Sequence, residues 1–477
     1  MKHIKILAAL VLLLTASCSK DDPVAVPVDS GTTGECTWII TDVRGNYTLT
    51  VSGDGAMENY ASAKTVPWYN YYDNIKTLII HDGVTTIGDC AFFGCDKITG
   101  KLTIPNSVTA IGDKAFIYCR SLTAINVDAA NPAYSSADGV LLNKNKTALI
   151  TCPDGKTGSY NIPNSVTVIG DWAFEGCINL IAVNIPNSVI TVSPYAFFFC
   201  SGLTAVTIPN SVTTIGSHAF SDCSGLVAMT IPNSVTAIGE KAFYYCSGLT
   251  DITIGNSVAV IGDGAFLSCS GLISINVNAA NPAYSSADGV LFNKNKTVLI
   301  TCPAGKTGSY NIPNSVITIG NSAFSSCSRL TGVIISSSVT AIGNSAFSSC
   351  RGLTGTLTVQ NSVKTIGDWA FEGCSGLTGV ITGNSVATIG GAAFRYCDDL
   401  TTFTIGNSVT TIGNYAFSDC SSLTNITNLK PAPQNINSNV FSRINLSGIA
   451  LNVPASAVTA YKSANVWKEF GSIQAIP

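Results

Sequence analysis

The sequence predicts a repeat solenoid in which each repeat, or rung, supplies one strand to a parallel sheet and one short helix. Three observations lead to this prediction. The motif Ala-Phe-x-x-Cys occurs twelve times, mostly at spacings of 23 or 24 residues, with two gaps of 58. A fixed period of this length is typical of solenoids, where each unit buries its apolar face only against the next. The chain is also 46% hydrophobic and only 11% charged. The motif cysteines are Cys95, Cys119, Cys177, Cys200, Cys223, Cys246, Cys269, Cys327, Cys350, Cys374, Cys397 and Cys420.

Residues 1–17 have the features of a signal peptide. A short basic segment precedes one apolar run, Ile6–Leu14, which is too short to span a bilayer and remain there. The small residues before Cys18 resemble the lipobox of bacterial lipoproteins, which implies that Cys18 becomes a lipidated N-terminus. Residues 19–22 resemble the charged tag that directs lipoproteins of Bacteroides-like bacteria to the outer face of the outer membrane. The alternative is an ordinary secretory signal with an incidental cysteine.

Residues 18–34 are expected to be a lipidated tether, because they are rich in Pro, Asp, Gly and Thr. Residues 35–78 are expected to cap the solenoid, which would otherwise expose an apolar rung at its end. Within this cap, residues 38–57 read as a hairpin or meander. Residues 67–72 are an aromatic cluster, which either closes the end of the core or offers a platform for a sugar.

The solenoid itself is expected over residues 79–425, and one rung shows the pattern. Val206 and Ile208 alternate with small or polar residues, as in a strand with one buried face. Ile215, Ala219 and Cys223 follow at i, i+4 and i+8, the spacing of one helical face.

A residue of the type that caps helix N-termini precedes this stripe in most rungs. These residues are Asp89, Asp113, Asp171, Ser193, Ser217, Asp263, Asn321, Asn344, Asp368 and Asn414, and the exceptions are Glu240 and Gly391.

The two gaps of 58 residues contain longer rungs, with hairpins expected over 131–152 and 281–302. The segments 125–170 and 275–320 match at an offset of 150 and differ at six positions. Lysines concentrate at the hairpin tips, which are either solvated loops or two equivalent contact points. Residues 426–477 are expected to form the second cap, built from a strand, a short helix and a terminal packed segment.

The repeat in Leu226–Cys246 resembles the BspA-like leucine-rich repeat family of the treponemal type. The resemblance covers nearly all of the chain after residue 36. It implies a right-handed leucine-rich-repeat solenoid and a role in adhesion. The family supplies no binding motif that can be transferred to particular residues of this chain.

Several functional classes are disfavoured by composition. No later stretch approaches the apolar length of a spanning helix, so a polytopic membrane protein is excluded. The net charge is −3 and no basic run exists, so no nucleic-acid partner is expected. After signal cleavage only His81 and His218 remain as histidines, and no cofactor fingerprint or metal-ligand motif occurs. No cofactor, no metal and no catalytic residue are therefore expected.

The twelve motif cysteines are expected to form a ladder of small buried side chains. Oxidation of neighbouring pairs is the alternative, because adjacent strands lie within the Cα distance of a disulfide. Cys36 lies outside this ladder and is expected to be exposed.

Two outward surfaces could bind a ligand. The first consists of outward strand residues, which are small and mostly uncharged: Asn126, Asn184, Thr207, Thr230, Asp251, Thr253, Asn276 and Thr404. Binding there would depend on many weak contacts, or the surface is purely structural. The second is an aromatic stripe on the helix side, which serves either recognition or packing between rungs: Phe93, Tyr118, Phe198, Phe199, Tyr244, Tyr245 and Tyr396.

The predicted function is a non-catalytic adhesin or interaction scaffold, anchored by lipid in the outer membrane and exposed at the cell surface. Expected partners are host extracellular-matrix or serum proteins, other bacteria, or glycans. The alternatives are a surface carbohydrate-binding module and, less favoured, a carbohydrate-active enzyme that works with carboxylates alone.

Overall fold

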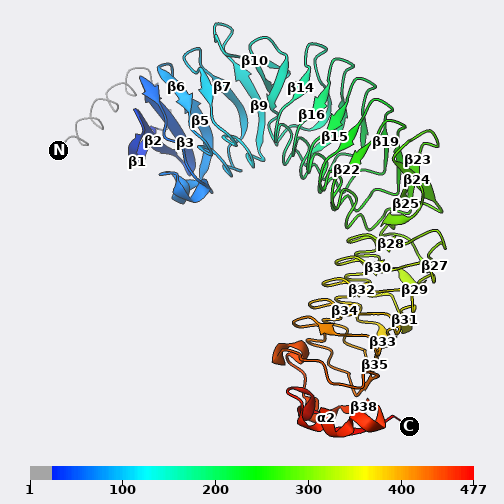
Figure 1. Cartoon of the computed structure of the whole chain (residues 1–477). Helices are drawn as coiled ribbons and strands as arrows, with labels where there is room; N and C mark the ends of the chain where they lie inside the picture. Colours follow the sequence, from blue (N-terminus) through cyan, green and yellow to red (C-terminus); the bar gives the residue numbers. More distant parts are fainter. Residues whose placement is uncertain (1–23, 477) are drawn as a thin grey trace. The chain divides into compact units, whose positions relative to one another are not determined.

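The computed structural model describes residues 24–476, so the signal peptide and Cys18 lie outside the described residues. The chain divides after Leu203 into two compact units, called unit 1 and unit 2 below. Figure 1 labels strands of both units. Both units are stacks of rungs joined by parallel strands, which confirms the predicted solenoid. Within the described residues, no helix combines the length and apolar character needed to cross a membrane.

Each rung of unit 1 places a long strand on one face of the stack and a short strand on another. The long strands are β5 (Ile75–Ile80), β7 (Gly100–Ile104), β9 (Leu122–Val127), β13 (Gly158–Asn161) and β15 (Leu180–Asn184). The short strands are β4 (Gly55–Ala56), β6 (Val84–Ile87), β8 (Ala110–Ile111), β14 (Val168–Ile169) and β16 (Thr191–Val192).

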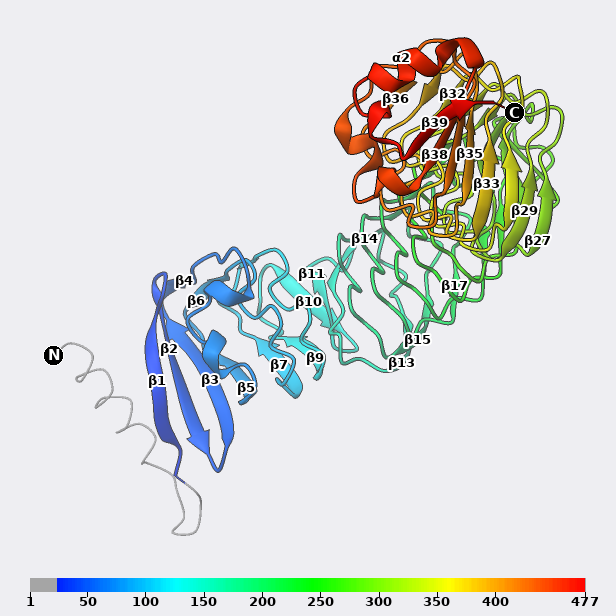
Figure 2. The same ribbon diagram turned by 90° about the horizontal axis from the view of Figure 1, so that it is seen from below.

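Unit 2 repeats this arrangement, and Figure 2 shows several of its long strands side by side. The long strands are β17 (Ala205–Thr207), β19 (Ala228–Ile231), β21 (Asp251–Ile254), β23 (Ser274–Val277), β27 (Gly308–Asn311), β29 (Leu330–Ile334), β31 (Gly355–Thr358), β33 (Leu377–Ile381), β35 (Thr402–Ile405) and β37 (Asn425–Asn428). The short strands are β18 (Thr214–Ile215), β20 (Ala237–Ile238), β22 (Val260–Ile261), β28 (Thr318–Ile319), β30 (Ala341–Ile342), β32 (Thr365–Ile366), β34 (Thr388–Ile389) and β36 (Thr411–Ile412).

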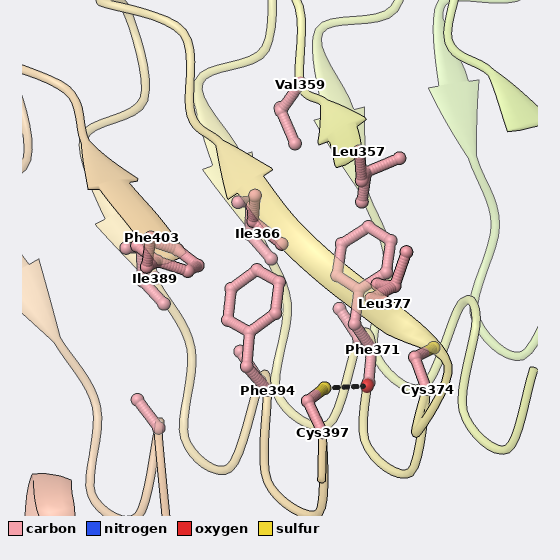
Figure 3. Packing of buried hydrophobic residues seen from close by; sticks show 14 of the residues in the cluster. Leu357, Val359, Ile366, Phe371, Cys374, Leu377, Ile389, Phe394, Cys397 and Phe403 are labelled. Carbon is pink, nitrogen blue, oxygen red and sulfur yellow. Dashed lines mark hydrogen bonds between the residues drawn. The ribbon is translucent and has the colours of Figure 1, made fainter. Parts of the chain in front are cut away.

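Identical side chains stack on one another inside the rungs (Figure 3). The rings of Phe347 and Phe371 are parallel to within 3° at a centroid distance of 5.0 Å, and Phe394 continues the stack at 5.2 Å. Such offset stacking stabilises aromatic pairs by about 1 kcal/mol beyond area burial. The parallel strands thus repeat one apolar cross-section along the stack.

The motif cysteines are buried, as predicted, and no disulfide joins the described cysteines. The Cys397 thiol donates to the carbonyl oxygen of Phe371 in the preceding rung at 3.3 Å (Figure 3). The thiol of Cys420 repeats this contact with the carbonyl of Phe394 at 3.0 Å. The expectation for Cys36 is wrong: it is 1% exposed and donates to a backbone carbonyl at 3.3 Å.

The short helix expected in each rung is replaced by consecutive turns, here called the turn segment. In residues 240–246, the N–H groups of Lys241, Phe243 and Tyr245 donate to carbonyls of the next rung at 3.0, 2.8 and 3.1 Å. The alternate N–H groups close turns within the segment. Lys241 and Tyr245 have φ values of +50° and +55°, and these left-handed residues reorient the peptide groups so that every second N–H points to the next rung.

The spacing between rungs explains this correction. An α-helix is about 10 Å wide and directs its N–H groups along its own axis. Successive rungs are instead one hydrogen bond apart, close to the strand spacing of about 4.8 Å, so helices cannot be stacked in register. The apolar pattern nevertheless identified the inward side chains correctly, because Ile215, Ala219 and Cys223 are all 0% exposed.

The residues predicted to cap helices instead link neighbouring rungs. The Asn321 side-chain oxygen accepts from the backbone N–H of Asn344 at 2.9 Å. The Asn344 side chain accepts from the N–H of Asp368 at 3.0 Å, and Asp368 accepts from that of Gly391 at 2.6 Å. The preference for Asp and Asn therefore reflects a ladder along the stack, with the acceptor satisfying an N–H about 23 residues away.

The N-terminal end of unit 1 is covered by β1 (Val26–Thr33), β2 (Cys36–Val43) and β3 (Asn46–Gly53), with 3₁₀-helices η1 (Ala63–Thr65) and η2 (Tyr69–Tyr71). The expectation that 18–34 is entirely tether needs correction, since residues 26–33 pair with β2 in an antiparallel ladder.

Trp68, from the aromatic cluster, is 0% exposed and stacks on Phe92 of the first rung at 5.7 Å. Its indole N–H donates to the carbonyl of Ala91 at 3.2 Å. This ring therefore lies in the core and is not available as a sugar platform.

Each long rung adds a three-stranded meander. The strands are β10 (Tyr134–Ala137), β11 (Val140–Asn143) and β12 (Ala148–Thr151) in unit 1, and β24 (Tyr284–Ala287), β25 (Val290–Asn293) and β26 (Val298–Thr301) in unit 2. Asn131 anchors the first meander at 0% exposure. Its amide N–H groups donate to the carbonyls of Pro105 and Val108, and its oxygen accepts from the N–H groups of Ala133 and Tyr134, all at 2.7–2.9 Å.

The C-terminal end of unit 2 continues the long-strand sheet with β38 (Ala450–Val453) and β39 (Ser472–Ala475). Between them lie the helix α2 (Val458–Ser463) and the 3₁₀-helices η5 (Ala455–Ala457) and η6 (Trp467–Glu469), preceded by η3 (Ser438–Phe441) and η4 (Leu446–Gly448). Trp467 is 0% exposed and contacts Phe441 at 6.0 Å, which covers the end of the phenylalanine stack.

Asn131→Ala is expected to destabilise unit 1 by about 3 kcal/mol or more, because several buried groups lose their partners at once. The measurement is the unfolding midpoint of residues 24–477 in denaturant. Asn145→Ala, an exposed change in the same hairpin, is the control and should stay within about 0.5 kcal/mol. Equal effects of the two changes would contradict the anchoring role of Asn131.

Candidate functional site

Two outward surfaces of the rungs carry the side chains singled out by the sequence. We call the outer side of the long strands the strand face, and the outer side of the turn segments the turn face. The rung that begins with β19 illustrates both: Ala228 and Thr230 lie on the strand face, while Lys241 and Tyr245 lie on the turn face.

The residues of the predicted ligand surface all lie on the strand face, with different exposure. Asn126 and Thr404 are half-buried, and the others are exposed: Asn184, Thr207, Thr230, Asp251, Thr253 and Asn276. Their assignment as ligand contacts remains a prediction.

The structure brings only part of this set together. In unit 2, Thr230, Thr253 and Asn276 occupy paired positions on adjacent strands and form one row. Thr404 lies on β35 in a different sheet, where it is paired with Ile381 on one side and Thr427 on the other. Asn184 belongs to unit 1, where its amide N–H donates to the side-chain oxygen of Asn161.

A groove of about 720 Å³ follows the strand face over β17, β19 and β21. Thr207, Thr230 and Thr253 contribute hydroxyl groups to its lining, and Asn233 contributes an amide. Ala205 and Ala228 also line it, so small side chains leave the backbone closely accessible. None of the lining residues is ionisable, and the groove therefore offers hydrogen bonds without charge. The sequence identified its threonines but not the groove itself.

The predicted aromatic stripe divides into packed and exposed members. Phe93 and Tyr118 are half-buried and meet edge to face across neighbouring rungs at 5.2 Å, which is packing between rungs. Phe198 and Tyr244 are also half-buried. By contrast, the following members are more than a third exposed: Phe199, Tyr245 and Tyr396.

The sequence analysis missed four further rings on the turn face. Trp172, Tyr195, Trp369 and Tyr415 each directly precede an Ala-Phe pair. Trp172 stacks on Tyr195 at 6.0 Å, and the Lys114 ammonium lies 4.5 Å from the Trp172 centroid. This position lies four residues before the second variable position of the motif, so the i, i+4 spacing could have placed these rings beside the stripe.

Both aromatic positions on the turn face have left-handed backbone. Trp369, Tyr396 and Tyr415 have φ values of +54°, +58° and +60°. For residues other than Gly, Asn and Asp this conformation costs about 1 kcal/mol or more. The turn face also uses glycine at equivalent positions, as at Gly264 and Gly373. The backbone therefore does not require these large side chains.

Buried carboxyl groups lie beneath the turn face of unit 1. Asp154 is 1% exposed, and Glu175 accepts a hydrogen bond from the Tyr118 hydroxyl at 2.8 Å. Burial raises the pKa of the Asp154 carboxyl to about 8, opposed by hydrogen bonds from backbone N–H groups including that of Tyr118. The charges of Glu175 and Arg120 act in opposite directions on it. Burial also raises the pKa of Glu175, and Tyr118 and Lys114 oppose this.

The matching long rung of unit 2 lacks these two carboxyl groups. The counterparts of Asp154 and Glu175 at the offset of 150 are Ala304 and Ser325. They line a cavity of about 80 Å³ together with Gly264 and Ser322. The two long rungs thus have nearly the same sequence but different groups at these two positions: two carboxyl groups in unit 1, and an alanine and a serine beside a cavity in unit 2. Within residues 24–476, no group of three or more His, Cys, Asp or Glu side chains is arranged to hold a metal ion.

Comparison with known protein families identifies the same repeat. The family model described as the BspA type leucine rich repeat region (6 copies) matches residues 67–155, 154–273, 304–381 and 353–464, well over half of the chain. Comparison with curated proteins gives no match.

Solved structures show the same architecture. A leucine rich cell surface protein from Faecalibacterium prausnitzii A2-165 has 28% sequence identity and a TM-score of 0.55, covering 86% of this chain and 96% of that chain. The pneumococcal vaccine antigen PcpA has 20% identity and a TM-score of 0.51, covering 94% of this chain and 98% of that chain. The second likeness concerns the fold alone.

The stability of unit 1 is expected to fall as pH rises from about 4 to about 8. The folded state holds the Asp154 proton up to its raised pKa of about 8, whereas an unfolded Asp releases it near pH 4. In this window the folded state binds more protons, so increasing pH favours unfolding. Asp154→Asn should reduce this slope while keeping a side-chain acceptor.

The measurement is denaturant unfolding of residues 24–477 across this pH range. Asp128→Asn is the control for net charge, since it removes a carboxylate from an exposed position and matches Asn278 of the second long rung. Parallel stability curves for the native chain and Asp154→Asn would contradict the predicted linkage.

Proposed function

The chain belongs to the family of BspA-type leucine-rich repeat proteins, and we propose that it is a cell-surface adhesin or protein-interaction scaffold that performs no catalysis. A leucine rich cell surface protein with 28% identity over 86% of this chain supports the surface role. The proposed partners are host extracellular-matrix or serum proteins, or the surfaces of other bacteria.

The observation that carries this proposal is the uncharged groove over β17, β19 and β21. Its hydroxyl and amide groups recur from strand to strand at about 4.8 Å, so a partner can make several equivalent hydrogen bonds along the stack. Each bond to a neutral group contributes only about 1 kcal/mol. Affinity would therefore come from contacts summed over several rungs.

The rim of the groove adds apolar surface. Val227 contributes to its lining and is 53% exposed. Ile273, at the corresponding position two rungs further on, is 56% exposed. Burying these exposed aliphatic side chains is favourable, and a protein partner offers apolar side chains against which they can pack. We therefore favour a protein partner for this groove.

Thr230→Arg is expected to weaken binding at least tenfold, because the long side chain would fill the groove and introduce charge. Binding of residues 24–477 to immobilised matrix and serum proteins, measured by surface plasmon resonance, tests this. Thr358→Arg is the matched control, since Thr358 is the equivalent exposed residue on β31 and does not line the groove. Loss of binding in both variants, or in neither, would count against the groove. Turnover of any polysaccharide would contradict the absence of catalysis.

We also propose that Cys18 carries the lipid that holds the protein in the outer membrane, with the solenoid at the cell surface. The lipobox-like residues before Cys18 support this assignment. The described fold begins with β1 at Val26, so a short segment would join the lipid to the folded chain.

Cys18→Ala is expected to shift the protein from the membrane fraction to the soluble fraction and to abolish its labelling on intact cells. Fractionation and labelling with a reagent that does not cross membranes provide the measurement. A variant that stays attached to the membrane would show that the lipid assignment is wrong.

A further inference from the structure

The turn face of unit 2 carries a second surface that differs from the groove in its chemistry. We propose that the patch formed by Trp369, Tyr396, Tyr415 and the guanidinium groups beside them binds a neutral polysaccharide chain. We call this surface the aromatic patch. It lies on other rungs and another face than the groove, so the two proposals can fail independently.

The three rings come from three successive rungs. The N–H of Trp369 donates to the carbonyl of Gly391 at 2.8 Å, and the N–H of Ala392 donates to that of Asn414 at 2.8 Å. Trp369, Ala392 and Tyr415 therefore occupy the same position in consecutive rungs, two steps of about 4.8 Å separating the two rings. Tyr396 comes from the middle rung at the second left-handed position.

The rings are open to solvent. Trp369 and Tyr415 are each 46% exposed, and Tyr396 is 38% exposed. Within the described part of the chain, none of the three packs against another aromatic ring. Between Trp369 and Tyr415, the middle rung has only the small residues Gly391 and Ala392. The aromatic side chains thus form an array along the stack with ring surface available to a ligand.

The fold does not require aromatic residues at these three positions. The left-handed conformation recurs at both positions of every motif-bearing rung, and glycine is the least strained residue there. Gly264 and Gly373 show that the turn segments accept glycine at both positions. The backbone therefore leaves the choice of side chain open, and the three exposed rings are free to serve a ligand.

A polar network lies beside the rings. The Arg395 guanidinium lies 4.4 Å from the Tyr396 centroid and donates to its hydroxyl at 2.6 Å. Asp419 lies between two arginines, 3.7 Å from Arg395 and 3.4 Å from Arg443. Hydrogen bonding from Ser418 and the charge of Arg443 hold the pKa of Asp419 below its usual value, so it remains an acceptor.

Exposed aromatic rings beside a network of hydrogen-bonding groups suit the binding of a sugar ring. Hydroxyl groups both donate and accept hydrogen bonds, and the network offers guanidinium donors beside a carboxylate acceptor. Aromatic faces suit the C–H surface of a sugar because they are apolar and slightly negative. The two arginines are accompanied by three carboxylates: Asp419, Glu372, whose charge interacts with Arg395, and Asp368, which accepts from the N–H of Gly391. The patch therefore has no excess of positive charge, which favours a neutral chain over a polyanion.

The array on successive rungs favours a polymer over a single sugar. Trp, Tyr and Arg are also enriched at protein hot spots, and a protein ligand is therefore an outcome that the experiment must distinguish. The neutral polysaccharide is preferred because the exposed rings are spaced along the stack and the patch has no excess of positive charge to attract a polyanion.

Affinity electrophoresis of residues 24–477 in gels containing dextran, xylan or mannan tests the proposal, with polygalacturonate as the acidic counterpart. At least one neutral polysaccharide should retard the protein, and more strongly than polygalacturonate does. Trp369→Gly and Tyr415→Gly should each weaken this binding at least tenfold. Their thermal unfolding midpoints should stay the same or rise, because glycine relieves the left-handed strain.

Tyr245→Gly is the matched control. Tyr245 is 49% exposed and left-handed at the same rung position as Tyr396, but lies outside the patch. This variant and Thr230→Arg should both retain polysaccharide binding. The proposal is overturned if no neutral polysaccharide retards the protein, if Tyr245→Gly loses binding equally, or if Trp369→Gly abolishes only binding to a protein.

Discussion

Backbone hydrogen bonds between successive rungs set the spacing of the whole stack. They keep neighbouring strands and neighbouring turn segments one hydrogen bond apart. In the turn segments, for example, the N–H of Phe243 donates to the carbonyl of Ala265 at 2.8 Å. Each inward side chain therefore lies beside its own copy at about 4.8 Å. Only side chains that pack well on identical neighbours fit, such as the stacked Phe347 and Phe371. The repeated apolar set, and the low fraction of charged residues, follow from this requirement.

The same constraint shapes the outer surfaces. Because the turn segments must donate laterally, two residues in each motif-bearing rung are left-handed, and their side chains point away from the core. The fold is indifferent to the size of these side chains, which range from Gly373 to Trp369. The strand face instead has small residues such as Ala228 and Thr230. Two surfaces of different chemistry thus arise from one repeat, and each can be adapted without disturbing the core.

The long rungs show how the stack tolerates insertions. Asn131 and Asn281 are 0% exposed, and each satisfies four backbone groups where the meander leaves the regular path. Elsewhere in the two long rungs the buried side chains differ. Asp154 in unit 1 and Ala304 in unit 2 occupy equivalent places, one with a buried carboxyl group and one beside a cavity.

The period, the inward residues and the hairpins of the long rungs could be predicted from the sequence, because they depend on patterns along the chain. The backbone of the turn segments could not, because the spacing of Ile215, Ala219 and Cys223 also fits a helix. The same holds for the side chain of Asp368, which accepts from the N–H of Gly391 in the next rung. Both features depend on hydrogen bonds between residues about 23 apart, set by the distance between rungs, which no local pattern records.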